Sequence, residues 1–161
     1  MIVSLATVWP LSFLLIAITD DLLFKKFHNW LFLTMLSISL LYTAILSPLS
    51  WAEAGFGFLT GLTLMLPLVL LRALGAGDMK FMMCLGVLLG ASTTLHVFIY
   101  SLFWGALLGI IRVLFSGQIL SFKNNLEAMS YRLTPHKLHT IPYTVAIFLG
   151  WLTWIQMGGL L

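Results

Sequence analysis

The sequence predicts an all-α membrane protein that forms a single domain, residues 1–161, and crosses the bilayer about six times. Hydrophobic residues make up 61% of the chain and charged residues only 8%, whereas a soluble domain carries roughly 25% charged residues. A chain this apolar cannot cover itself with a wetted surface, so we expect lipid around it. The net charge of +3 is too small and too dispersed to indicate a nucleic-acid partner.

The apolar segments of the chain are the candidate spans. They are residues 2–19, 30–46, 56–71, 80–90, 95–114 and 141–157. The first lacks the positively charged leading region of a secretory signal, and Ser47-Pro48 closes the second. The third contains Pro67, which favours a kink, the fourth is short, the fifth is a long apolar run, and Pro142 fits the first turn of the sixth. Residues 116–140 are too polar to span, so we expect a loop there. Small-xxx-small patterns, which let membrane helices approach closely, occur at Gly57–Gly61, Gly86–Gly90 and Gly105–Gly109.

The basic residues predict the orientation of these spans. Lys and Arg concentrate on the cytoplasmic side of membrane proteins. With the N-terminus outside, all eight lie in or beside the cytoplasmic segments, about residues 20–29, 72–80 and 115–140. The outer loops then keep only Glu53 and His96 as potentially charged residues. The eight are Lys25, Lys26, Arg72, Lys80, Arg112, Lys123, Arg132 and Lys137.

Acidic residues are rare, and two of them are candidates for chemistry. Asp78 lies in Gly75-Ala76-Gly77-Asp78, between two apolar runs. An ionisable group costs roughly 2.5–3.5 kcal/mol at the centre of a membrane helix, so such a group indicates function. The glycines allow the backbone to bend beside the carboxylate. Asp21 ends the first apolar run at the same predicted face, and two carboxylates at one face indicate acid/base hydrolysis.

A metal or cofactor is not expected. Cys84 is the single cysteine of the chain, which excludes an internal disulfide and a multi-cysteine zinc site. His136 and His139 are three positions apart, but the sequence offers no evident third ligand. Hydrolysis by two aspartates needs neither group.

Three segments carry a resemblance to a known family. Gly75-Ala76-Gly77-Asp78, followed by Met79-Lys80, matches the Gly-x-Gly-Asp signature of intramembrane aspartyl proteases and resembles the type IV prepilin peptidase family. The segment from Asp21 to Asn29 resembles the family's first motif, and Pro142-Tyr143 resembles its Pro-Tyr motif near the last helix. His28 stands where the family usually has proline, and Phe27 where a branched aliphatic residue is usual.

The resemblance implies an aspartic endopeptidase with Asp21 and Asp78 as the catalytic pair. Its substrates would be prepilins or pseudopilins, whose short basic leaders are cut at the cytoplasmic face of the bacterial inner membrane. The compact chain resembles peptidases of tight-adherence (Flp-type) pilus systems, and it lacks the cysteine-paired region linked to methyltransferase activity, which we therefore do not expect. The residues that would support the site are Gly75, Gly77, Lys80, Asn29, Pro142 and Tyr143.

Several alternatives remain open at the level of sequence. Asp20 competes with Asp21, although the eight positions from Asp21 to Asn29 match the family spacing. Lys80 either contacts the catalytic pair or substrate, or extends to the membrane interface. Asn29 either caps the second helix or forms a hydrogen bond near the site. The competing functions are a small ion-coupled transporter or channel subunit, with Asp21 and Asp78 as cation or proton ligands, and an inactive prepilin-binding scaffold.

Overall fold

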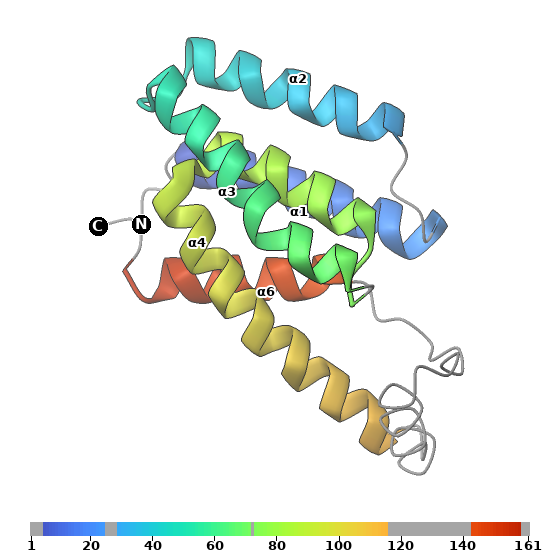
Figure 1. Ribbon diagram of the computed structural model, residues 1–161. Helices are drawn as coiled ribbons and strands as arrows, with labels where there is room; N and C mark the ends of the chain where they lie inside the picture. The colour runs from blue at the N-terminus through green and yellow to red at the C-terminus, as the bar shows by residue number, and fades with distance from the viewer. Residues whose placement is uncertain (1–4, 25–28, 72, 116–142, 159–161) are drawn as a thin grey trace.

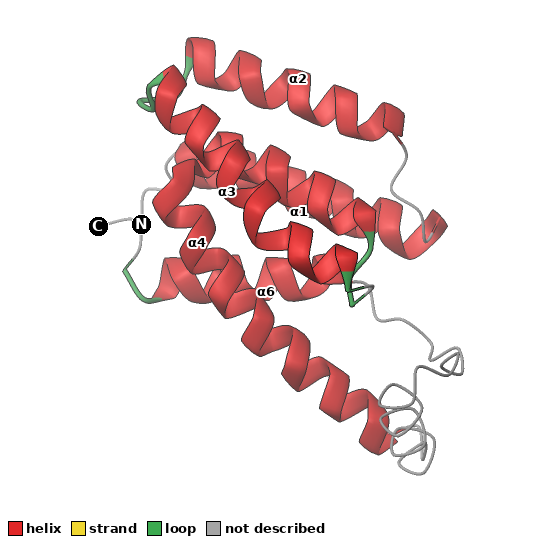
Figure 2. Cartoon of the chain, viewed as in Figure 1, coloured by secondary structure: helices red, strands yellow, loops and turns green. Residues whose placement is uncertain are grey.

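Helices make up all the regular structure in the described part of the chain. A computed structural model describes all residues except 1–4, 25–28, 72, 116–142 and 159–161. The helices are α1 (Leu5–Phe24), α2 (Asn29–Ile45), α3 (Trp51–Leu70), α4 (Ala76–Phe115) and α6 (Tyr143–Gln156), and Figure 2 shows no strand among the described residues. The predicted all-α class is confirmed, whereas the predicted loop at 116–140 lies outside the described residues.

Successive helices run back and forth, so the bundle has two distinct ends (Figure 1). One end holds the last turn of α1, the first turns of α2, α4 and α6, and the end of α3; we call it the motif end. The opposite end holds the turn between α2 and α3 and the bend of α4. Helix α4 is central, because it packs against α1, α2, α3 and α6.

A bend at Gly90 divides α4 into two arms. Gly90 has φ 76° and ψ 170°, a conformation that glycine adopts far more readily than other residues. The arms correspond to the predicted fourth and fifth spans. The prediction of a loop between them is wrong, because residues 91–94 are already helical. A single glycine is enough to reverse the direction of the chain here.

Two of the described helices are long and apolar enough to cross a bilayer. They are Trp51–Leu70 and Ala76–Arg112, the second counted across the bend at Gly90, while Trp9–Thr19, Asn29–Ile45 and Tyr143–Gln156 are shorter apolar stretches. A membrane protein is consistent with these lengths. Six spans and the orientation of the chain stay predictions.

The first arm of α4 forms the core. Every residue from Phe81 to Leu88 is buried, and this segment packs with Leu14 of α1, Met65 of α3 and Trp151 of α6. Asp78 and Lys80 come just before it in the chain, where α4 emerges at the motif end.

Close backbone contact joins α3 to this arm. A Cβ atom on Gly57 would lie 2.0 Å from the carbonyl oxygen of Gly86, and a Cβ on Gly61 would lie 2.7 Å from that of Met82. The predicted close approach is therefore confirmed for Gly57, Gly61 and Gly86. The third pattern is used in part, because Gly105 faces the Tyr143 ring whereas Gly109 has nothing within 4 Å.

Glu53 and His96 lie in helices. The prediction that placed them in outer loops is wrong. Ser50 caps α3: its side chain accepts a hydrogen bond from the Glu53 N–H at 3.2 Å, and its own N–H donates to Glu53 Oε2 at 2.8 Å. This reciprocal capping box starts α3 at Trp51, ahead of the predicted residue 56. His96 lies in the second arm of α4, where its Nδ1 is 2.7 Å from the Ser92 carbonyl oxygen.

Candidate active site

Asp78 sits in the first turn of α4, held by the glycine that precedes the helix. The Gly75 N–H donates to Asp78 Oδ2 at 3.2 Å, and the Met79 N–H donates to the Gly75 carbonyl at 3.4 Å. A Cβ on Gly75 would lie 3.2 Å from the same carboxylate oxygen, so a larger residue would crowd it. Gly77 lies beside Asp78 in this turn and is half-buried. The positive end of the helix macrodipole also favours a carboxylate in the first turn.

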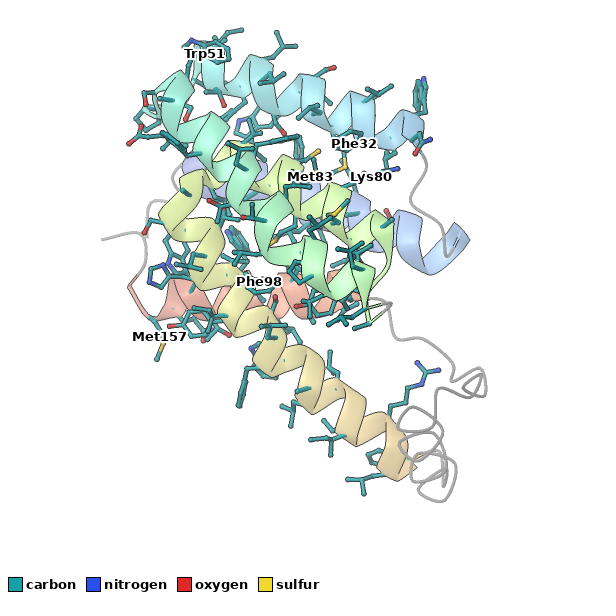
Figure 3. All side chains as sticks on the ribbon, viewed as in Figure 1. Phe32, Trp51, Lys80, Met83, Phe98 and Met157 are labelled. Carbon is teal, nitrogen blue, oxygen red and sulfur yellow. The ribbon has the colours of Figure 1, made fainter. Side chains whose placement is uncertain are left out.

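Lys80 joins this helix to the first motif. Its Nζ donates a hydrogen bond of 2.5 Å to Asn29 Oδ1 and lies 6.0 Å from the centre of the Phe32 ring. Figure 3 shows Lys80 and Phe32 facing one another between α2 and α4. Asn29 is the first residue of α2, so the contact joins the starts of two helices that are far apart in sequence. Phe32 was not a sequence candidate, because an aromatic residue in an apolar run carries no signal of its partner.

Tyr143 connects α6 to the same region. Its buried hydroxyl is 2.8 Å from Ser101 Oγ, and Ser101 donates its own proton to the Phe98 carbonyl at 2.7 Å. A serine hydroxyl has one proton, so Tyr143 is the donor to Ser101. The Asp78 carboxylate lies within electrostatic range of the Tyr143 hydroxyl. Tyr143 thus joins the start of α6 to the second arm of α4, and Ser101 is a partner that sequence reasoning missed.

The position of Asp21 in the fold follows from its place in α1. It lies in the last turn of α1, at the motif end (Figure 1), and α1 packs against both α4 and α6. The side chains of Asp20 and Asp21 are outside the described residues, as are Pro142, Lys25, Lys26, His136 and His139. Within the described part of the chain, no three His, Cys, Asp or Glu residues gather as a metal site.

Comparison with known families identifies the chain. A sequence profile of the type IV leader peptidase family matches residues 9–110, which is more than half of the chain. The protein belongs to the type IV leader peptidase family. No curated protein and no solved structure gives a significant match.

The family match covers most of the candidate site residues. The matched region of this leader peptidase includes Asp21, Asn29, Asp78 and Lys80 and ends before Tyr143. The contacts of Tyr143 therefore connect a helix beyond the matched region to the region that defines the family.

Proposed function

We propose that this protein is an aspartic endopeptidase that removes the short basic N-terminal leader of prepilins or pseudopilins. The observation that carries the proposal is the placement of Asp78 at the start of α4, on the end of the bundle where α1 delivers Asp21. Membership of the leader peptidase family supports the reaction class. The substrate would present its leader and the start of its apolar helix to the motif end.

The reaction needs one carboxylate to deprotonate water and one carboxylic acid to polarise the scissile carbonyl. Two neighbouring carboxylates do not both ionise readily, so the pair holds one proton near neutral pH. The pair titrates as a unit. Neither a covalent intermediate nor a metal is needed for this chemistry.

The helix ends favour one distribution of that proton. Asp78 lies in a first turn and accepts the Gly75 N–H, and both features favour the ionised form. Asp21 lies in a last turn, where the negative end of the helix macrodipole disfavours a second charge. Each effect contributes about 0.3–1 kcal/mol, so the state with Asp78 ionised is favoured by roughly 3- to 30-fold. We assign Asp78 as the base and Asp21 as the acid.

Cleavage of a prepilin in liposomes tests the proposal. Asp21→Asn and Asp78→Asn should abolish or strongly reduce cleavage, and Asp20→Asn should cut normally. Asparagine at position 78 still offers an oxygen to the Gly75 N–H, so its loss of activity reports the missing base and not a broken helix start. Cleavage at the wild-type rate by either Asp21→Asn or Asp78→Asn would refute the aspartyl mechanism.

The role assignment has its own readout. The amide introduced by Asp21→Asn can still donate a hydrogen bond to the scissile carbonyl, whereas the amide introduced by Asp78→Asn cannot accept a proton from water. Asp21→Asn should therefore keep more residual activity than Asp78→Asn. The opposite order would reverse the assignment without refuting the aspartyl mechanism.

We further propose that the motif end faces the cytoplasm at the inner membrane. Single cysteines at Ser50 and Ala73 sit at opposite ends of the bundle and can be introduced into a Cys84→Ala background. A membrane-impermeant maleimide added to intact cells should label the cysteine at position 50 and not that at position 73. Labelling of position 73 alone would show the reverse orientation. The absence of methyltransferase activity stays a prediction, tested by methyl transfer to the cleaved product.

A further inference from the structure

The contact between Lys80 and Asn29 is a side-chain hydrogen bond that joins α2 to α4 at the motif end. A hydrogen bond from a cation to an amide oxygen is stronger than one between neutral groups. The ammonium also lies over the Phe32 ring at 6.0 Å, a separation within the range of cation–π attraction. Both partners of Lys80 are in the first turn of α2.

Lys80 and Asp78 leave α4 on different faces of the helix. Residues two positions apart in a helix do not share a face. Lys80 extends to α2, whereas Asp78 folds back to the Gly75 N–H and lies within electrostatic range of Tyr143 on α6. The hydrogen bond of the Lys80 ammonium therefore joins α4 to the start of α2.

Holding the start of α2 also restrains the end of α1. Only residues 25–28 join Phe24 to Asn29, and a chain spans at most about 3.6 Å per residue. Towards the opposite end the same two helices meet at Trp9 and Tyr42, whose ring centres are 5.3 Å apart. An aromatic contact thus joins α1 to α2, and Lys80 joins the start of α2 to α4.

We infer that Lys80 is a positioning residue, which anchors Asn29 and so sets the place of the Asp21-bearing end of α1 relative to Asp78. This inference rests on the proposed peptidase function. The charge of Lys80 argues against a role as a docking group for substrate, because the proposed leader is itself basic. Lys80 and Asn29 act as one unit in this scheme, and the Phe32 ring packs beneath the Lys80 ammonium.

Steady-state cleavage by four single variants and one double variant tests the inference. Lys80→Met keeps the apolar stem but removes the donor, and Asn29→Leu removes the acceptor. Both should lower kcat by roughly 10- to 100-fold, the cost of a small misplacement of catalytic groups, with little change in KM. Lys80→Arg keeps a charged donor over the ring, and Asn29→Asp keeps an acceptor, so both should restore most of kcat. The double variant Lys80→Met/Asn29→Leu should be no slower than the worse single variant.

A matched control separates positioning from general stability. Glu53→Ala breaks a hydrogen-bonded contact at the opposite end of the bundle, so it should lower the thermal midpoint without changing the kcat of the folded protein. The inference is overturned if Lys80→Met cuts like the wild type, or if unfolded protein accounts for its whole loss of activity, so that the kcat of the folded fraction equals that of Glu53→Ala. A wild type that cuts no prepilin would instead refute the proposed function, and the positioning role with it.

Discussion

Gly57→Ala is the sharpest test of how α4 is held in place. The added Cβ would lie 2.0 Å from the Gly86 carbonyl oxygen and 2.7 Å from its carbonyl carbon. Ordinary contact begins near 3.4 Å, so the two backbones must separate by roughly 1.4 Å at this crossing. No side-chain rotation can relieve the overlap, because both neighbours are backbone atoms.

The expected destabilisation follows from two opposing terms. Overpacking costs about 1–3 kcal/mol, and an overlap with backbone on both sides belongs at the upper end. Alanine has a better helix propensity than glycine and offsets about 1 kcal/mol of this. The net loss is about 2 kcal/mol, which corresponds to a fall in Tm of about 4–8 °C for a chain of this size.

Gly55→Ala is the matched control, since Gly55 lies in the same helix, is exposed, and has nothing within 4 Å of an added Cβ. Thermal unfolding in detergent, followed by helical circular dichroism, should show a lower Tm for Gly57→Ala and an equal or higher Tm for Gly55→Ala. If the two variants have the same Tm, the backbone contact between α3 and α4 does not hold the bundle together.

The other predictions concern two hydrogen-bonded pairs. Ser50→Ala should cost about 1 kcal/mol of unfolding free energy, the usual value of a helix cap, and an unchanged Tm would show that its bonds with Glu53 do not stabilise α3. Tyr143→Phe removes the donor to Ser101 and should cost about 1 kcal/mol. In the same thermal assay, the double variant with Ser101→Ala should lose less than the sum of the two single changes; strict additivity would show that this hydrogen bond contributes nothing.

Apolar run lengths predicted the helices well because the length of an apolar run limits what it can cover or cross. The two errors in helix boundaries arose at positions where a few residues set the backbone. The start of α3 was missed although Ser50 and Glu53 carry the spacing of a capping box, a signal that the hydropathy pattern does not contain. The loop predicted after Gly90 was wrong because one glycine with positive φ replaces several loop residues.

The small-residue patterns show what spacing can and cannot predict. Gly57 and Gly86 meet at backbone distance, whereas Gly109 has the same spacing from Gly105 and no neighbour within 4 Å. Spacing puts two glycines on one helix face. It says nothing about whether another helix crosses there, because that depends on the course of the whole chain.

The position of Lys80 shows most clearly what long-range structure adds. The sequence left two interpretations of Lys80: contact with the catalytic pair or substrate, or extension to the membrane interface. The partner is Asn29, which is distant in the sequence. The same hydrogen bond shows that the Asn29 side chain makes a contact between α2 and α4. A free cation beside Asp78 would favour ionisation of both aspartates and so oppose a shared proton. Lys80 is hydrogen-bonded to Asn29, so its ammonium is held by α2. In the proposed mechanism the Gly75 N–H and the helix macrodipole then favour the ionised form of Asp78.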